Sequence, residues 1–391
     1  MSPLAFFRIK RLNQVHRTLL NADPVKTLIK EVAIASGFRQ LGQLSRDYQK
    51  MFGELPSETL RSHKNHAKSF PARKIIAPQP NVANEMASEV LDGLLQKPKR
   101  IAPKYFYDQR GSALFDTITK LDEYYIPRIE QHIFSLFKRD MCEEIGTART
   151  IIEPGAGSCE KIKWLLPDIS PAAYVPMDIS ESHLRENAAK LGLAYPGLIV
   201  DPRVCDHTND TMLDIKLPGS SPVFFYPGSS IGNFEPEAVI DFMRKLRVMM
   251  GSGGGLLIGV DTKKNSEVLH TAYNDPKGVT AAFNINVLHH LNHLLGGNLK
   301  PDYFEHVAFY NENCGRIEMH LRCVKSHIAH IAGMDLEFSV GELINTEYSY
   351  KYHPQEFSAL AQRAGLRMKR LWQDKQRYFS VMYFLPALLT V

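Results

Sequence analysis

The sequence has no apolar run of the roughly 18 residues that a membrane-spanning helix needs. Its first residues, from Met1 to Arg11, mix phenylalanine with lysine and arginine. They contain neither the apolar stretch nor the cleavage site of a secretory signal. We therefore expect neither a membrane span nor secretion, and the sequence predicts a cytoplasmic protein.

Cysteine is scarce and irregularly placed. The 391 residues include five cysteines, an odd number without a C-x-x-C pair. This pattern indicates neither a disulfide framework nor a zinc site. The histidines in the second half of the chain have a spacing that fits no metal-ligand set. They are His289, His290, His293 and His306. No bound metal is expected.

The chain also lacks internal repeats and low-complexity tracts, and its 44% hydrophobic and 10% aromatic content is typical of a globular protein. Its net charge of +5 is unevenly distributed. Residues 1–74 contain 14 Lys and Arg against 5 Asp and Glu, a net charge of +9, which leaves −4 for residues 75–391. A basic block of this kind suits contact with nucleic acid phosphates, although a solvated basic face is the commoner explanation.

Residues 1–62 read as a series of short helices. We expect them around Leu4–Leu20, Val25–Ser36 and Leu41–Phe52, with a last short helix after Pro56. The segment resembles the C-terminal part of an AraC-type DNA-binding domain, and the first helix-turn-helix unit of that domain is absent. The matching residues are Arg11-Leu12, Leu19-Leu20-Asn21, Val32-Ala33, Ser36-Gly37-Phe38, Ser45-Arg46, Phe52-Gly53 and Pro56-Ser57.

On the presumed recognition helix, Gln40, Gln43 and Arg46 have the donor and acceptor geometry to read base edges. Half of a DNA-binding domain predicts weak binding to DNA, and a docking module or a fusion remnant is the favoured alternative. Residues 63–90 contain Pro71, Pro78 and Pro80 and are expected to be a linker.

Beyond residue 100 the chain alternates strand-like apolar runs with helical stretches, which favours a doubly wound α/β sheet. Ile151–Pro154 leads into a glycine turn and an expected helix at Glu160–Leu166. Tyr174–Asp178 is a second strand that ends in an acid 23 positions after Gly155. That spacing is typical of a carboxylate that accepts hydrogen bonds from a ribose.

Further strands are predicted to end at equally polar residues. Arg203–Asp206, Val223–Tyr226 and Leu256–Asp261 each carry an acid or a glycine loop at the carboxyl end, where such sheets bind ligands. Arg367–Trp372 and Tyr378–Phe384 predict an antiparallel hairpin at the sheet edge. A final antiparallel hairpin favours a methyltransferase-type sheet over a nicotinamide-binding one.

Residues 75–391 resemble the histidine-specific Nα-methyltransferase family that begins ergothioneine synthesis. The resemblance depends on several motifs in the right order. They are Tyr105-Phe106-Tyr107-Asp108 with Gly111-Ser112 and Leu114-Phe115-Asp116, Glu123-Tyr124-Tyr125 with Arg128, Gly155–Lys161, Gly228-Ser229 with Ile231-Gly232-Asn233, Ala272-Tyr273 with Gly278-Val279-Thr280 and Phe283-Asn284, Ile317-Glu318-Met319, and Thr346-Glu347-Tyr348-Ser349.

The resemblance implies S-adenosylmethionine as the cofactor. Asp178 would accept from the ribose hydroxyls and Asp206 from the adenine amino group, while Lys161 and the glycine turn would face the methionine end. The implied cofactor-binding residues are Gly155, Lys161, Asp178, Asp206, His207 and Gly228.

The resemblance also implies a pocket for L-histidine. Asn233 and Tyr273 would hold the carboxylate, and Glu347 and Ser349, two apart on a strand and so on one face, would bind the two ring nitrogens. A site built from such hydrogen bonds rejects analogues better than an apolar pocket does. Tyr107 would act as the catalytic residue that positions the amine. The other substrate-binding residues are Tyr124 and Met319.

The implied architecture is a Rossmann-like class I methyltransferase core, 135–261 with 352–391, and an inserted α+β substrate-binding domain, 91–134 with 262–351. The implied product is Nα-trimethylhistidine (hercynine). Two alternatives remain open: an enzyme of the same fold that methylates another amine, and a DNA-binding regulator whose methyltransferase-like part senses a ligand. Singly, each tyrosine and Glu347 is also explained as a packing or surface residue.

Overall fold

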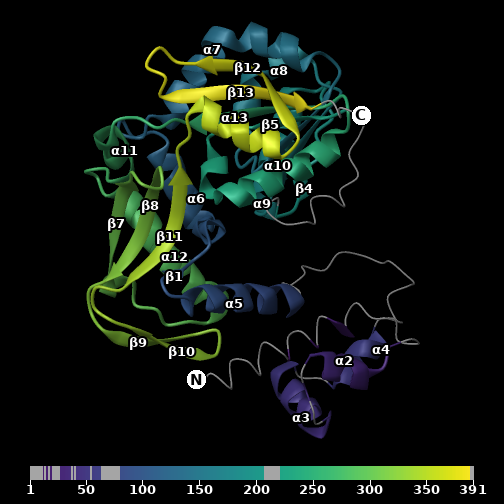
Figure 1. Ribbon diagram of the computed structural model, residues 1–391, viewed down its shortest axis with the longest axis vertical. Helices are drawn as coiled ribbons and strands as arrows, with labels where there is room; N and C mark the ends of the chain where they lie inside the picture. Colours follow the sequence, from purple (N-terminus) through teal and green to yellow (C-terminus); the bar gives the residue numbers. More distant parts are fainter. Residues whose placement is uncertain are drawn as a thin grey trace. The chain divides into compact units, whose positions relative to one another are not determined.

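The computed structural model describes residues 80–206 and 221–387, and within the N-terminal part residues 12, 15, 18–19, 27–36, 38, 41–52 and 55–62. The chain forms two compact units, Met1–Ala83 and Asn84–Val391. Figure 1 labels their helices and strands. In the described residues no helix combines the length and the apolar character that a membrane span requires.

The N-terminal unit contains the short helices that the sequence predicts. The described helices are α2 (Ile29–Ala35), α3 (Leu41–Phe52) and α4 (Pro56–Ser62). Tyr48 of α3 is fully buried and its hydroxyl donates to Thr59 Oγ1 at 2.9 Å, which ties α3 to α4. Of the predicted base-reading residues, Arg46 is exposed, whereas Gln40 and the side chain of Gln43 lie outside the described residues.

The expected linker is partly helical. Helix α5 (Pro80–Leu94) begins within the segment 63–90 and continues into the second unit. Val90 and Leu94, four residues apart on one helix face, are buried there. Residues 80–90 therefore belong to a helix whose residues Val90 and Leu94 join the apolar core of the second unit, and Pro80 stands at its first position, where proline is compatible with a helix.

The centre of the second unit is a seven-stranded sheet with the order β12-β13-β6-β5-β2-β3-β4. Strands β2 to β6 run parallel, and β13 pairs antiparallel with both β6 and β12. The predicted α/β fold with a final antiparallel hairpin is thus confirmed. The strands are β2 (Thr150–Pro154), β3 (Ala173–Asp178), β4 (Arg203–Val204), β5 (Val223–Tyr226), β6 (Gly255–Asp261), β12 (Leu366–Gln373) and β13 (Phe379–Pro386).

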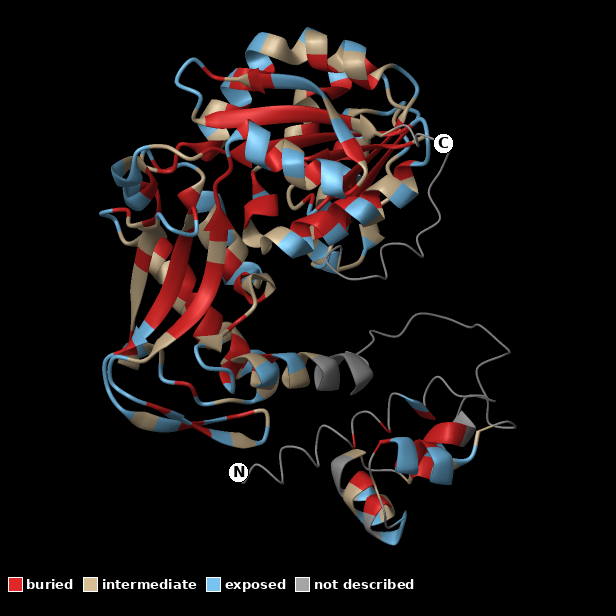
Figure 2. Cartoon of the chain, viewed as in Figure 1, coloured by how far each residue is buried: buried red, intermediate tan, exposed pale blue. Residues whose placement is uncertain are grey.

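Both faces of this sheet are buried, as Figure 2 shows by its continuous buried strands. Ile151 packs into the apolar core on one face and Ile152 into the core on the other, because successive strand side chains point in opposite directions. Each such buried side chain stabilises the fold by about 1.5–3 kcal/mol. Helices α7 (Ile126–Ile145) and α9 (Glu181–Ala194) cover the first face, and α10 (Pro236–Met250) and α13 (Pro354–Arg363) the second.

Two sequence expectations about this core are wrong in detail. Glu160–Leu166 is not one helix but a 3-10 turn, Lys161–Trp164, followed by the single turn α8 (Leu166–Ile169), because Pro167 lacks the amide that would continue a helix through it. The domain boundary expected at 134/135 falls inside α7, whose length packs on the core sheet. The core therefore takes in all of α7.

A second, smaller sheet carries the part of the unit that was expected to bind the substrate. Its strand order is β1-β11-β8-β7, and α6, α11 and α12 pack around it. The α+β character of this part is as predicted. The elements are β1 (Lys99–Arg100), α6 (Gln109–Ile118), α11 (Ser266–Tyr273), α12 (Val279–Leu295), β7 (Phe304–Asn311), β8 (Arg316–Cys323) and β11 (Leu343–Tyr350), with the hairpin β9 (His327–Ile331) and β10 (Met334–Phe338) beyond them.

Candidate functional site

The strand order of the core reverses between β2 and β5. From β2 the chain adds β3 and β4 on one side and then β5 and β6 on the other. In open α/β sheets ligands bind at such a switch point, outside the carboxyl ends of the strands. The glycine turn that begins at Gly155 follows β2 and Gly228 follows β5, so both loops flank this crevice.

Asp178, at the end of β3, holds the glycine turn. Its Oδ2 accepts from the Gly157 amide at 3.0 Å and its Oδ1 from the Ser180 amide at 2.9 Å. Each carboxylate oxygen keeps a further acceptor site. Gly157 has a φ of +49°, and a Cβ there would meet nothing within 4 Å. The turn therefore faces open space beside a carboxylate with free acceptor capacity.

Lys161 is held from behind by a buried acid. Its Nζ donates to Glu130 Oε2 at 2.7 Å, and the Gly228 amide donates to Glu130 Oε1, also at 2.7 Å. Glu130 lies on α7 and is fully buried. Gly228 has a φ of +84°, and a Cβ there would lie 2.6 Å from Lys161 Nζ, so only glycine fits. Glu130 thus fixes the lysine and the glycine loop relative to each other.

Asp206 lies just beyond β4 at the same edge of the sheet. Its Oδ2 accepts from Lys104 Nζ at 3.4 Å, and Lys104 also pairs with Glu89 at 2.7 Å. The structure therefore brings five of the six expected cofactor residues to one sheet edge. The sixth, His207, lies outside the described residues. The donor and acceptor groups at this edge fit the expected cofactor: a carboxylate for a ribose, a second carboxylate for an amine, and a lysine for a carboxylate tail.

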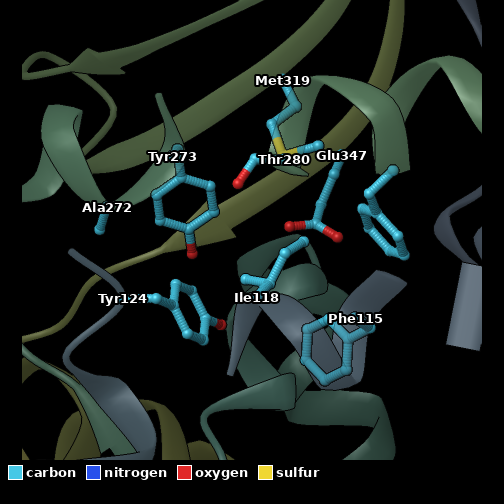
Figure 3. A pocket seen from close by; sticks show the side chains of 9 residues that line it. Phe115, Ile118, Tyr124, Ala272, Tyr273, Thr280, Met319 and Glu347 are labelled. Carbon is cyan, nitrogen blue, oxygen red and sulfur yellow. The ribbon is translucent and has the colours of Figure 1, made fainter. Parts of the chain in front are cut away.

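A pocket of about 290 Å³, part of it open to solvent, lies between α6, α11, α12 and the second sheet. Figure 3 shows Tyr124, Tyr273 and Glu347 turning their oxygen atoms toward the same space. The lining residues are Phe115, Ile118, Tyr124, Ala272, Tyr273, Thr280, Phe283, Met319 and Glu347.

Glu347 is the acid of this pocket. It is 9% exposed, and burial raises the pKa of its carboxyl to about 7, while the positive charge of Lys351 opposes that rise. Asn233 Nδ2 lies 3.5 Å from Glu347 Oε2. Ser349, on the same face of β11, contacts the Tyr273 hydroxyl at 3.0 Å. Each expected carboxylate-binding residue therefore lies beside an expected ring-binding residue.

Tyr107 lies at the rim of the pocket. Its ring is edge-on to Phe115 and Phe283, with centroids 5.7 Å and 5.9 Å away, and its side chain is 39% exposed overall. The pKa of its hydroxyl is nevertheless raised well above the usual value, first by desolvation and then by the charges of Glu347 and Asp178. The hydroxyl end is thus within electrostatic reach of both the pocket and the cofactor crevice.

The histidine-rich region has a structural role where the structure describes its contacts. His306 Nε2 lies 2.9 Å from the Tyr273 carbonyl oxygen, so it donates, and its Nδ1 then accepts from Asn284 Nδ2 at 2.9 Å. Burial lowers the pKa of His306, consistent with a neutral ring. Across the described ranges, no three His, Cys, Asp or Glu side chains form a group that could hold a metal ion.

Two residues that organise this site are absent from the residues predicted for it. Glu130 holds the cofactor loop, and Lys351 lies buried beside the pocket, where it pairs with Asp261, the acid predicted to end its strand. A sequence signal exists for both. Lys351 continues the two-residue spacing of Glu347 and Ser349 along the strand, and Glu130 is a charged residue within the apolar stripe of α7 that includes Ile133.

Comparison with known proteins places the two units in different groups. A family model for histidine-specific, SAM-dependent methyltransferases matches residues 86–386, and a helix-turn-helix domain model matches residues 1–62. A histidine N-alpha-methyltransferase of Mycolicibacterium smegmatis is 38% identical over 307 residues, which are 77% of this chain and 95% of that protein. One from Mycobacterium tuberculosis is 36% identical, over 75% of this chain and 92% of that protein. An L-tryptophan methyltransferase of Psilocybe serbica is 25% identical, over 76% and 92%.

Proposed function

Because the chain belongs to the family of histidine-specific, S-adenosylmethionine-dependent methyltransferases, we propose that it methylates the α-amino nitrogen of L-histidine. Three successive transfers would give Nα-trimethylhistidine, the first step of ergothioneine synthesis. The observation that supports this proposal most strongly is the position of Glu347. Its carboxylate is buried in a pocket otherwise lined mainly by aromatic and apolar side chains. An imidazole N–H is the ligand group that such an acceptor recognises.

The residues at the sheet edge would hold the cofactor. Asp178 would accept from the ribose hydroxyls and Asp206 from the adenine amine, with Lys161 toward the methionine carboxylate. Gly155 and Gly228 would let the backbone approach closely. When bound, S-adenosylmethionine supplies an electrophilic methyl group on a sulfonium sulfur.

The pocket residues would orient the amino acid. Asn233 and Tyr273 would hold the carboxylate, while Glu347 accepts from one ring nitrogen and Ser349 donates to the other. Tyr124 and Met319 would complete the walls of the site. Holding the amine and the methyl group in attack geometry can lower a barrier by several kcal/mol, up to about 7–11 kcal/mol in favourable cases. The aromatic rings also suit the growing methylammonium cation.

Tyr107 would position the amine rather than remove its proton. Its raised pKa keeps the hydroxyl protonated near neutral pH, so the oxygen is an acceptor for an amine N–H and not a base. We expect Tyr107→Phe to lower kcat about tenfold, the value of one hydrogen bond of roughly 1–1.5 kcal/mol. Affinity for S-adenosylmethionine should not change. Steady-state kinetics would measure kcat, and titration would measure the affinity for the cofactor. An unchanged kcat would show that Tyr107 does not position the amine.

A substrate panel tests the proposed function. The protein would be incubated with S-adenosylmethionine and histidine, tryptophan or leucine, and release of S-adenosylhomocysteine would be measured. We expect release with histidine only, because leucine leaves Glu347 without a partner and the tryptophan indole, which has an N–H but no acceptor nitrogen, leaves Ser349 without one. Release with tryptophan instead would favour the alternative amine. Binding without release would favour a ligand-sensing regulator.

For the N-terminal unit we propose weak contact with DNA through charge. The helix-turn-helix match and the net charge of +9 over residues 1–74 support it. Such binding loses affinity steeply with salt, by about 10³–10⁵ between 50 and 200 mM for 6–10 phosphate contacts, and less for fewer. Fluorescence anisotropy of a labelled duplex would measure it. If the protein does not bind the duplex even at low salt, the N-terminal unit is a docking module or a fusion remnant instead.

A further inference from the structure

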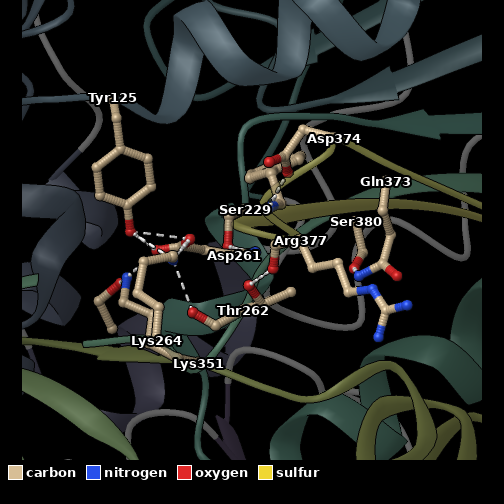
Figure 4. Close-up of polar contacts among 12 residues, drawn as sticks. Tyr125, Ser229, Asp261, Thr262, Lys264, Lys351, Gln373, Asp374, Arg377 and Ser380 are labelled. Atoms are coloured by element: carbon tan, nitrogen blue, oxygen red, sulfur yellow. Dashed lines mark hydrogen bonds and ion pairs between the residues drawn. The ribbon is translucent and has the colours of Figure 1, made fainter. Parts of the chain in front are cut away.

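Figure 4 shows a cluster of buried charges around Asp261. One of its members, Lys351, contacts Tyr273 of the pocket lining. We call Asp261, Lys264, Lys351 and Tyr125 the buried lysine cluster. Asp261 ends β6 of the core, and Lys351 follows β11 of the smaller sheet. The side chains of Asp261 and Lys351 are 0% exposed and that of Lys264 is 3% exposed. The cluster therefore joins the cofactor-binding core to the substrate pocket.

All three hydrogens of the Lys351 ammonium are used. Its Nζ lies 2.9 Å from Asp261 Oδ2, 2.8 Å from Ser349 Oγ and 3.1 Å from the Tyr273 hydroxyl. An ammonium has three donors and no acceptor. One bond thus anchors Lys351 to the core, and the other two are spent on two hydroxyl groups of the pocket wall.

Lys264 and Tyr125 hold Asp261 in place for this. Lys264 donates to Asp261 Oδ1, to the Tyr125 hydroxyl and to the Thr262 carbonyl, and Tyr125 donates to Asp261. The two lysines are balanced by Asp261 and by the buried Asp374, whose charge also acts on Lys264. Because these buried charges are paired and hydrogen-bonded, they fix the position of Lys351.

A count of protons shows what Lys351 does to the two hydroxyls. Each hydroxyl has one proton and two acceptor sites. The Tyr273 hydroxyl donates to Ser349 Oγ at 3.0 Å, so the Tyr273 proton lies between the two oxygens. Lys351 fills the other acceptor site on Ser349 Oγ. Because that oxygen can then accept nothing more, its own proton is available to donate into the pocket.

We propose that Lys351 is a positioning residue that makes Ser349 a hydrogen-bond donor toward the amino-acid substrate. The proposal depends on the function proposed above. Ser349 then donates to a ring nitrogen that carries no proton. With Glu347 accepting from the other ring nitrogen, the pocket selects one neutral tautomer of the imidazole.

The first test is Lys351→Met, which removes the charge and keeps the length of the side chain. We expect KM for histidine to rise about 10- to 100-fold, as the loss of charge-assisted hydrogen bonds implies, with the affinity for S-adenosylmethionine within about twofold. Lys263→Met is the matched control, since Lys263 pairs with Glu356 at a partly exposed position away from the pocket. We expect this control to leave KM unchanged.

A double-mutant cycle separates positioning from a structural role. If Lys351 acts through Ser349, the effect of Lys351→Met on KM shrinks in a Ser349→Ala background, because the hydroxyl it directs is gone. Equal effects in both backgrounds would overturn the proposal. So would an unchanged KM in Lys351→Met.

A measurement on the unaltered protein covers the case in which Lys351→Met does not fold. Histidine with ¹⁵N in the ring would be bound with S-adenosylhomocysteine, and ¹⁵N chemical shifts would give its protonation at neutral pH. We expect one protonated and one unprotonated ring nitrogen. If histidine binds and is methylated but its bound ring is doubly protonated, the role proposed for Lys351 is contradicted and the proposed function is not. Absence of histidine binding or methylation would instead contradict the proposed function.

Discussion

Replacing Glu347 with glutamine is expected to lower kcat/KM for histidine by about 10- to 100-fold, with the affinity for S-adenosylmethionine unchanged. The carboxylate is a charged acceptor for a ring N–H, and a hydrogen bond to a charged group is worth about 1.5–3 kcal/mol. Glutamine keeps the shape and one oxygen acceptor but loses the charge. Isothermal titration of each ligand and steady-state kinetics would measure the effect.

Glu318→Gln is a matched control for this substitution. Glu318 lies on the neighbouring strand β8 and is 7% exposed, similar to Glu347, but it pairs with Arg316. The next residue, Met319, lines the pocket, so Glu318 points to the other face of the sheet. We expect the control to retain the KM for histidine. An unchanged histidine affinity in Glu347→Gln would refute the assignment of the imidazole to Glu347.

The pKa of Glu347 adds a pH dependence to the same prediction. Because burial raises that pKa to about 7, the carboxyl is protonated below pH 7 and becomes an ionised acceptor above it. We therefore expect KM for histidine to fall as pH rises through about 7. Deprotonation of the substrate amine also favours turnover at higher pH, so the comparison is made with Glu347→Gln, in which the Glu347 contribution is absent.

Replacing Asp178 with asparagine is expected to weaken S-adenosylmethionine binding about 100-fold. Two charge-assisted hydrogen bonds to the ribose would be lost, each with a value of about 1.5–3 kcal/mol before compensation. The new amide group would also face the backbone amide of Gly157 or Ser180, which now donate to the carboxylate. Calorimetric titration of the cofactor would measure the loss.

Asp168→Asn is the control for this variant, because Asp168 is a partly exposed acid that pairs with the surface residue Lys138 at 2.8 Å. Thermal unfolding of both variants would show that the turn has kept its fold. If the Asp178→Asn protein is folded and binds the cofactor as tightly as the unaltered protein, Asp178 does not contribute to cofactor binding.

The sequence predicts well those features that depend on short range patterns. The two-residue spacing of Glu347 and Ser349 follows from strand geometry, and both side chains do reach the pocket region. Asp178 is predicted as the acid that ends the strand Tyr174–Asp178. Its place at the ligand-binding edge follows because parallel strands bring their carboxyl ends to one edge. Patterns of this kind are local, so they can be recognised in the sequence without knowledge of the tertiary structure.

Contacts between distant segments are beyond such patterns. Glu130 reaches Lys161 and the Gly228 amide across 31 and 98 residues of sequence. Lys351 meets Asp261 only because the two sheets come together. Helix α5 begins inside the segment that the prolines predict as a linker, and it is buried through Val90 and Leu94. Packing between elements decides each of these cases.

The position of the methyl groups on the product tests the arrangement of the pocket most directly. In this arrangement Glu347 and Ser349 hold the ring nitrogens, and only the α-amine faces the cofactor crevice. Tandem mass spectrometry of histidine after incubation with the protein and S-adenosylmethionine would locate the added groups. We expect three methyl groups on the α-nitrogen and none on the ring. Methylation of the ring would contradict this arrangement of the pocket. So would histidine that stays unmodified in the presence of an intact methyl donor.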